Sequence, residues 1–163
     1  MGADADAGGD RPDAIARRIP HQGSMCLLDA VLEWDVDHIR CETGTHLVQA
    51  HPLRAFGRLG AACGVEYAAQ AMAVHGALVA GGGDGQAATS PPRSGYLAGM
   101  RGVQLHVDRL DTVAGPLSVS AQRITGDAHT VLYSFSVDAA GQPLVSGRAM
   151  VVLDATPLQQ GQP

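Results

Sequence analysis

A histidine and a glutamate fifteen residues apart are the first candidates for chemistry in this sequence. His51 lies in a segment that Pro52 and Gly57 interrupt, and Glu66 lies in the long apolar segment that follows. An imidazole and a carboxyl group brought together at an apolar site are the usual equipment for general acid–base catalysis. A surface histidine and a helical glutamate in a salt bridge fit the same spacing, and spacing alone favours that plainer interpretation.

The segment that carries Glu66 is the only long helical signal in the chain. Residues 61–80 contain no proline and are rich in alanine, methionine and leucine. Apolar residues lie all the way round this helix, which predicts a helix enclosed by protein. Glu66 and Gln70 share one face, and together with His75 they argue against a membrane span. Since an unpaired buried carboxylate is costly, Glu66 must be bonded, protonated or facing a cavity.

The segments around the helix have the patterns of strands. Leu32 and Trp34 alternate with charged residues, and a turn near residues 35–37 leads to a second strand at 39–45, which predicts a hairpin. From residue 95 the apolar pattern has a period of two. It predicts strands at 95–107, 117–122, 131–138 and 144–153. Five or six antiparallel strands that curl round one long helix make an α+β domain.

The ends of the chain and one internal segment differ in composition from this domain. Residues 1–13 form a Gly/Ala/Asp tail that we expect to be disordered, and residues 155–163 form a loose polar tail. The segment 81–95 is longer than an ordinary connection between elements. Its glycine-rich composition predicts a mobile lid or a disordered insertion, with disorder favoured. A single domain at 14–154 remains.

Composition narrows the class of protein. The formal charge of −5 argues against nucleic acid or an anionic membrane surface as the main partner. All 11 cationic residues are arginine, which removes lysine Schiff-base chemistry and the phosphate-loop lysine. Three cysteines without a C-x-x-C pair fit a reducing compartment, and the N-terminus has no apolar run typical of a signal peptide, so we expect a cytoplasmic protein.

The remaining histidines show no pattern of metal ligands. No two of them have ligand spacing on one recognisable element, so neither a metal nor another cofactor is expected. His75 on the helix predicts a bonded residue of the core or an interface. The others near turns and strands predict solvated side chains: His38, His46, His106 and His129.

Four segments resemble the hot-dog fold (3R)-hydroxyacyl-[acyl carrier protein] dehydratases. IPHQGSMCLLDAV at 19–31 is similar to the family's L-P-H-R-x-P-x-L-L-[VI]-D-x-V opening, and His51 occupies the place of its G-H-F-P histidine. GVEYAAQAM at 64–72 resembles the family's E-x-x-A-Q helix. AGMRGVQLHVDRL at 98–110, with Gly115 downstream, resembles the glycine-led strand and the P-G-D turn. The resemblance covers 19–153 and looks closest to the divergent aryl-polyene-type branch.

The resemblance implies a hot-dog fold and the elimination of water from a 3-hydroxyacyl thioester to give a trans-2-enoyl thioester. His51, neutral near pH 7, would take the C2 proton, and Glu66, kept protonated by burial, would give one to the leaving hydroxyl. The amides of Gly60 and Ala61 at the helix start would stabilise charge on the thioester oxygen. Gln70 would hold Glu66 or the nascent water.

The same resemblance implies partners. In hot-dog dimers the histidine and the acid of one site come from opposite protomers, so we expect an obligate homodimer or a heterodimer with a related subunit, and higher oligomers stay open. The acyl chain would arrive on an acidic carrier protein or on coenzyme A. Candidates for a basic rim that receives it are Arg54, Arg58, Arg101 and Arg109. Arginines that merely solubilise the surface explain the same residues.

Departures from the family pattern keep two other functions open. Ala50 replaces the glycine before the family histidine, the aromatic after it is absent, and Leu59-Gly60-Ala61 replaces the Pro-Gly pair at the helix start. These changes fit a catalytically weak subunit that stabilises an active dehydratase partner. A hot-dog acyl thioesterase, which often also carries a carboxylate on the central helix, is the other alternative.

Overall fold

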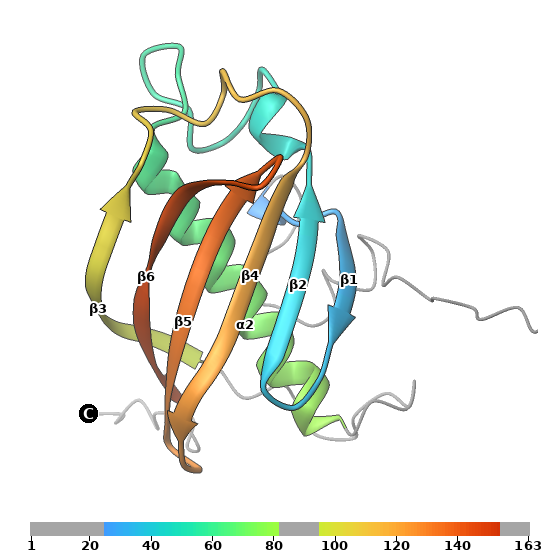
Figure 1. Cartoon of the computed structure of the whole chain (residues 1–163), viewed down its shortest axis with the longest axis vertical. Helices are drawn as coiled ribbons and strands as arrows, with labels where there is room; N and C mark the ends of the chain where they lie inside the picture. Colours follow the sequence, from blue (N-terminus) through green and yellow to red (C-terminus); the bar gives the residue numbers. More distant parts are fainter. Residues whose placement is uncertain (1–24, 82–94, 154–163) are drawn as a thin grey trace, which may run out of the picture.

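Six strands and one long helix make up the part of the chain that the computed structural model describes, residues 25–81 and 95–153. The antiparallel sheet has the order β1-β2-β4-β5-β6-β3, and α2 lies across one of its faces, behind the sheet in Figure 1. The strands are β1 Ala30–Trp34, β2 His38–Thr43, β3 Gly95–Leu105, β4 Leu117–Gly126, β5 Thr130–Ala139 and β6 Gln142–Leu153. The helices are the 3-10 turns η2 Thr45–Leu47 and η3 Ala61–Cys63, and the α-helix α2 Gly64–Ala80.

Helix α2 is the element around which the core forms. It packs on β2, β4, β5 and β6, and the buried side chains along it are mainly small, as the alanine-rich sequence predicts. The helix begins close to the sheet, because a Cβ added at Gly64 would lie 2.8 Å from a methyl group of Val145. The first turn, where Glu66 lies, is therefore fixed against β6.

Strand β5 and the first half of β4 bury alternate residues against the helix, which confirms the predicted period of two in these two strands. In β5 the buried positions run from Val131 to Ala139 at every second residue, and the positions between them face away from α2. Ala140 and Gly141, with φ of 50° and 76°, form the tight turn between β5 and β6. The hairpin of β1 and β2 is also confirmed.

Strand β3 forms one edge of the sheet, at the left of Figure 1. Among the described residues it pairs with β6 alone, and all of its residues are exposed. Its exposed apolar side chains are Tyr96, Leu97, Met100, Val103 and Leu105. An unpaired edge with apolar side chains is a surface on which another strand can add.

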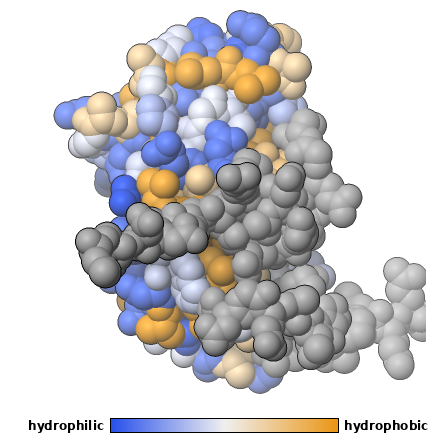
Figure 2. Space-filling view, turned by 90° about the vertical axis from the view of Figure 1, so that its right-hand side faces the viewer, coloured by the Kyte–Doolittle hydropathy of each residue, from blue (hydrophilic) through white to orange (hydrophobic). Residues whose placement is uncertain are grey.

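Some expectations lie outside the described residues. They concern the N-terminal tail, the C-terminal tail and positions 82–94 of the glycine-rich segment. In the described ranges, no helix has the length and apolar character that crossing a bilayer requires. Figure 2 views the molecule from the β1 side and shows hydrophilic residues interspersed with smaller hydrophobic spots.

Candidate active site

His51 is buried in the loop between η2 and η3, with 5% of its surface exposed. Both ring nitrogens make hydrogen bonds within the chain. The backbone N–H of Leu53 donates to Nδ1 at 3.1 Å, and Nε2 lies 2.9 Å from the hydroxyl oxygen of Tyr67. Tyr67 comes from the first turns of α2 and is fully buried. The histidine that the sequence singles out is thus held against the helix.

A series of hydrogen-bonded hydroxyl groups continues from Tyr67 to the backbone. The Tyr67 hydroxyl lies 2.8 Å from the Oγ1 of Thr45, and Thr45 Oγ1 donates to the carbonyl of Leu27 at 2.8 Å. Thr43 Oγ1 donates to the same carbonyl. Sequence reasoning missed Tyr67 and Thr45. The available signal was a tyrosine hydroxyl inside an alanine-rich buried helix, since such hydroxyls usually find a partner.

Burial lowers the pKa of His51 below its ordinary value, and the nearby Arg54 and His46 lower it further. His46 is itself fully buried, so the prediction that it is solvated was wrong. Its Nε2 bonds the carbonyl of Val113 at 3.0 Å, while its Nδ1 has no hydrogen-bond partner among the described residues. The pKa of His46 is likewise lowered, chiefly by burial.

His75 is confirmed as a bonded residue of the core. Its Nδ1 lies 2.8 Å from the Tyr133 hydroxyl and its Nε2 lies 2.8 Å from the carbonyl of Asp35, which ties the middle of α2 to β5 and to the β1–β2 turn. Burial is the main reason that its pKa is lowered. The structure therefore buries His46, His51 and His75 in the neutral form.

We expect acid to destabilise the fold through these three histidines. Their folded pKa values lie below the unfolded value of about 6.5, so the unfolded chain binds more protons and stability falls as the pH drops below that value. Each contributes a part of the ~1.4 kcal/mol per pH unit that one histidine can supply at most. Melting temperatures at pH 7.5, 6.5 and 5.5 test this. Exposed His129→Gln should leave the slope unchanged, and a flat profile in the wild type would contradict the prediction.

Glu66 lies in the first turn of α2 and is half-buried. Burial raises the pKa of the nearby Cys63 thiol, and the Glu66 carboxylate raises it further. Consecutive residues of a helix diverge by about 100°. Because Tyr67 points to His51, Glu66 points to a different side of α2 from the one that holds the histidine.

The backbone amides expected to polarise a thioester are only partly available. The N–H of Ala61 donates to the carbonyl of Asp108 at 3.0 Å, so the expectation that it stabilises an oxyanion was wrong. This hydrogen bond belongs to an antiparallel bridge between Gly60 and Arg109, which joins the segment before α2 to the segment after β3. Within the described ranges, the N–H of Gly60 has no hydrogen-bond partner. Gly60 therefore stays a candidate donor.

Gln70 has a different set of partners from the expected one. Its Oε1 accepts the N–H of Leu27 at 2.8 Å, and its Nε2 donates to the carbonyl of Met25 at 2.6 Å. The side chain is fully buried. Gln70 thus fixes the segment before β1 to the helix. It bonds the N–H of Leu27, and the carbonyl of Leu27 is the group that accepts from Thr45 at the end of the hydroxyl series.

Two of the four rim arginines are engaged within the fold. Arg109 pairs with Asp111 through two hydrogen bonds, and Nη1 of Arg54 lies 3.6 Å from the same carboxylate. Asp111 also accepts the N–H of Leu59 at 3.1 Å. The hydrogen bond from Arg109 is the main reason that the pKa of Asp111 lies well below its usual range. The expectation of a basic rim was wrong for Arg54, whose side chain is only 12% exposed, because it anchors the His51 loop.

The other two arginines are exposed and far apart in the chain. Arg58 follows a tight turn whose tip, Phe56, has φ of 53° and is fully exposed. Arg101 lies on β3, opposite Arg148 of β6. Of the four arginines, Arg58 and Arg101 therefore have no ion-pair partner within residues 25–81 and 95–153.

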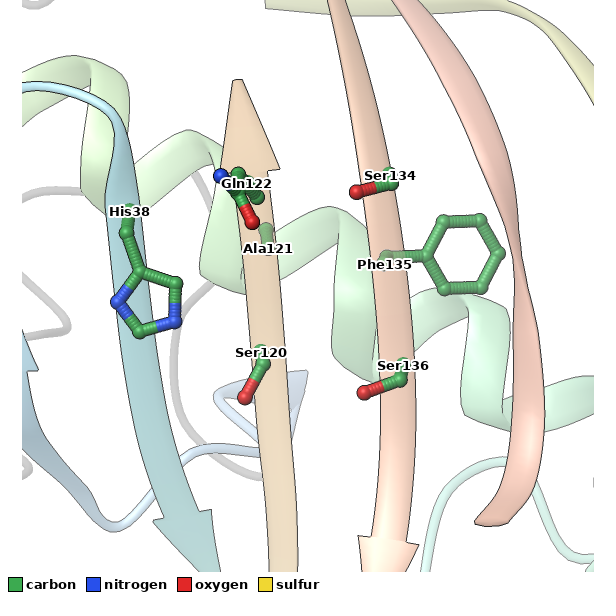
Figure 3. Close-up of a pocket in the computed structure, with 7 residues that line it drawn as sticks. All are labelled: His38, Ser120, Ala121, Gln122, Ser134, Phe135 and Ser136. Atoms are coloured by element: carbon green, nitrogen blue, oxygen red, sulfur yellow. The ribbon is translucent and has the colours of Figure 1, made fainter. Parts of the chain in front are cut away.

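Two shallow hollows lie on the face of the sheet opposite α2. One, of about 170 Å³, is lined by hydroxyl and polar side chains that point away from the helix in Figure 3: His38, Ser120, Gln122, Ser134 and Ser136. The other, of about 450 Å³, adjoins it and includes Arg101 and Arg148. His51 and Glu66 line neither hollow. No group of three or more potential metal ligands occurs among the described residues.

Comparisons with known proteins identify the fold and the family. The ApeI:P dehydratase heterocomplex from Xenorhabdus doucetiae matches with a TM-score of 0.72 at 22% identity, covering 87% of this chain and 91% of that chain. A hypothetical thioesterase from Streptococcus pneumoniae TIGR4, solved with coenzyme A, matches with a TM-score of 0.54 at 10% identity, covering 76% and 84%. These likenesses confirm the hot-dog fold.

The family assignment rests on the sequence. A search of curated proteins finds no match. The family model "ApeP-like", described as ApeP dehydratase, matches residues 13–160, nearly the whole chain, which confirms the resemblance to a dehydratase of the aryl-polyene type. The chain therefore belongs to the ApeP-like family of dehydratases.

Proposed function

We propose that this dehydratase eliminates water from a 3-hydroxyacyl thioester, with Glu66 as the acid, in a site completed by a second hot-dog subunit. The observation that carries the proposal is that the two candidate residues face different sides of α2. His51, in the loop before the helix, is bonded to Tyr67 of α2, whereas Glu66, the residue before Tyr67, points to another side of the helix. A histidine that meets Glu66 then comes from the other subunit, as the family pattern implies.

The chemistry needs two proton transfers. A histidine takes the C2 proton, the C3–O bond breaks, and Glu66 gives a proton to the leaving hydroxyl, so that water and a trans-2-enoyl thioester form. The N–H of Gly60 is the candidate donor to the thioester oxygen. Each group must be in place before the thioester arrives.

The open edge of β3 supports a two-subunit assembly. Its exposed backbone and apolar side chains offer a second hot-dog subunit a strand to pair with. We propose a homodimer or a heterodimer formed through this edge. The acyl group would be carried by an acyl carrier protein or by coenzyme A, and of the four candidate arginines Arg58 and Arg101 are exposed enough to meet an acidic carrier.

A second candidate function is a partner subunit with little activity of its own. Two observations favour it. Both nitrogens of His51 are engaged within the chain, and the match with TM-score 0.72 is to a dehydratase heterocomplex. In that case the active histidine would belong to a related hot-dog subunit and this chain would supply Glu66.

An assay of the purified chain separates these functions. 3-Hydroxyacyl thioesters are offered on coenzyme A and on a carrier protein, and both the absorbance of the conjugated product and the release of free thiol are followed. We expect the enoyl product without free thiol. Free thiol without the enoyl product would identify a thioesterase. A folded, dimeric and inert chain would support the partner subunit.

A further inference from the structure

The hydrogen bonds that end on His51 determine which of its nitrogens carries the proton. We propose that Tyr67 is a positioning residue that, together with the backbone amide of Leu53, holds neutral His51 as the Nε2–H tautomer, so that this imidazole is a hydrogen-bond donor and has no lone pair for the C2 proton. The consequence for catalysis rests on the proposed function. The evidence for the tautomer is the geometry of four hydrogen bonds, which join Leu53 to His51, His51 to Tyr67, Tyr67 to Thr45 and Thr45 to Leu27.

The far end of the series is compatible with one direction of the donors. A carbonyl only accepts, and Thr45 Oγ1 lies 2.8 Å from the carbonyl of Leu27. When Thr45 donates to that carbonyl, its oxygen accepts the proton of the Tyr67 hydroxyl, at 2.8 Å. The Tyr67 oxygen then accepts from Nε2 of His51, at 2.9 Å.

The near end of the series leads independently to the same tautomer. The backbone N–H of Leu53 points to Nδ1, and a backbone amide is always a donor. Nδ1 therefore presents its lone pair, and the single proton of the neutral ring lies on Nε2. Turning the ring over would place carbon atoms opposite both the Leu53 amide and the Tyr67 hydroxyl, which would forfeit both hydrogen bonds.

The consequence concerns the origin of the base. In this tautomer the one lone pair of His51 is already used by Leu53, and a proton on Nδ1 would face the amide proton of Leu53. His51 of this chain then braces the loop against α2, and the proton acceptor that faces Glu66 comes from a different hot-dog subunit. This favours a heteromeric assembly over a homodimer whose only histidine at this position is His51.

The tautomer can be measured directly by nitrogen NMR on the full chain labelled with ¹⁵N-histidine, with the His51 signals assigned from His51→Gln. We expect the proton on Nε2 and a bare Nδ1. In Tyr67→Phe, which keeps the ring but removes the hydroxyl, we expect the Nε2–H of His51 to shift and to exchange with solvent at least tenfold faster. A packing role of Tyr67 alone would leave both unchanged.

Tyr133→Phe is the matched control, because it removes the hydroxyl that bonds His75 and leaves His51 untouched. We expect it to move the His75 signals only. A proton on Nδ1 of His51 in the wild type, or His51 signals that Tyr67→Phe does not move, would overturn the inference.

A second measurement uses stability. Glutamine can donate an N–H near the position of Nε2, so we expect His51→Gln to melt within about 3 °C of the wild type. His51→Ala, which leaves buried polar groups without partners, should melt about 5–10 °C lower. Equal losses in both variants would count against a donor role. Neither measurement requires turnover, so a failed dehydratase assay would contradict the proposed function and leave this inference standing.

Discussion

Glu66→Gln is expected to lower kcat/KM for the dehydration by about 10²- to 10⁴-fold, the usual contribution of a general acid or base. Glutamine has nearly the shape of glutamic acid but cannot give a proton to the leaving hydroxyl. Glu66 is half-buried in the first turn of α2, and this turn lies close to β6 because Gly64 has no side chain. The isosteric change should therefore leave the backbone in place. The enoyl product formed from a 3-hydroxyacyl thioester, followed by absorbance, is the measurement.

The control for this variant is a carboxylate outside the candidate site. Glu42 is an exposed residue of β2, and Glu42→Gln should retain wild-type activity. Melting curves of both variants show whether the fold persists. An active Glu66→Gln variant would remove Glu66 from the chemistry, and with it the proposed site. An equal loss in Glu42→Gln would point to an effect of charge rather than to proton transfer.

The fold was predictable because its signals are local. Alternation in β4 and β5 and the unbroken apolar segment of α2 each specify one buried face, and the glycine turn at residues 140–141 specifies a hairpin. A helix with apolar residues on every side can be satisfied only by a sheet that curves around it. Each of these patterns spans only a few neighbouring residues, so a single sequence is enough to predict the strands, the helix and the turn.

The partners of the site residues could not be predicted, because they come from distant segments. His51 is hydrogen-bonded to Tyr67, sixteen residues away, and the backbone N–H of Ala61 donates to the carbonyl of Asp108. The sequence pattern predicted Arg54 as a surface cation, but in the fold it pairs with Asp111, which no pattern in the sequence marked as its partner. Polar side chains in a helix or loop state only that a partner is needed, and the partner's identity depends on the folded arrangement.

Gln70→Ala is expected to lower the free energy of unfolding by about 2–4 kcal/mol, because it leaves one buried and one part-buried backbone group without partners. The side-chain amide of Gln70 accepts from the N–H of Leu27 and donates to the carbonyl of Met25. Glutamine at this position resembles the family's catalytic helix motif, yet its contacts here are structural. Denaturant unfolding, with Gln122→Ala on the outer face of the sheet as the control, measures the difference.

The variant also connects the fold to the histidine. Leu27, which Gln70 holds by its N–H, offers its carbonyl to Thr45 and so ends the hydrogen-bond series that begins at His51. If Gln70 is lost, that carbonyl is no longer held in place, and the Nε2–H of His51 should exchange faster with solvent even in molecules that remain folded. A Gln70→Ala variant that is as stable as Gln122→Ala would show that water replaces the amide at both backbone groups. An unchanged His51 signal would show that Thr45 holds its position without the help of α2.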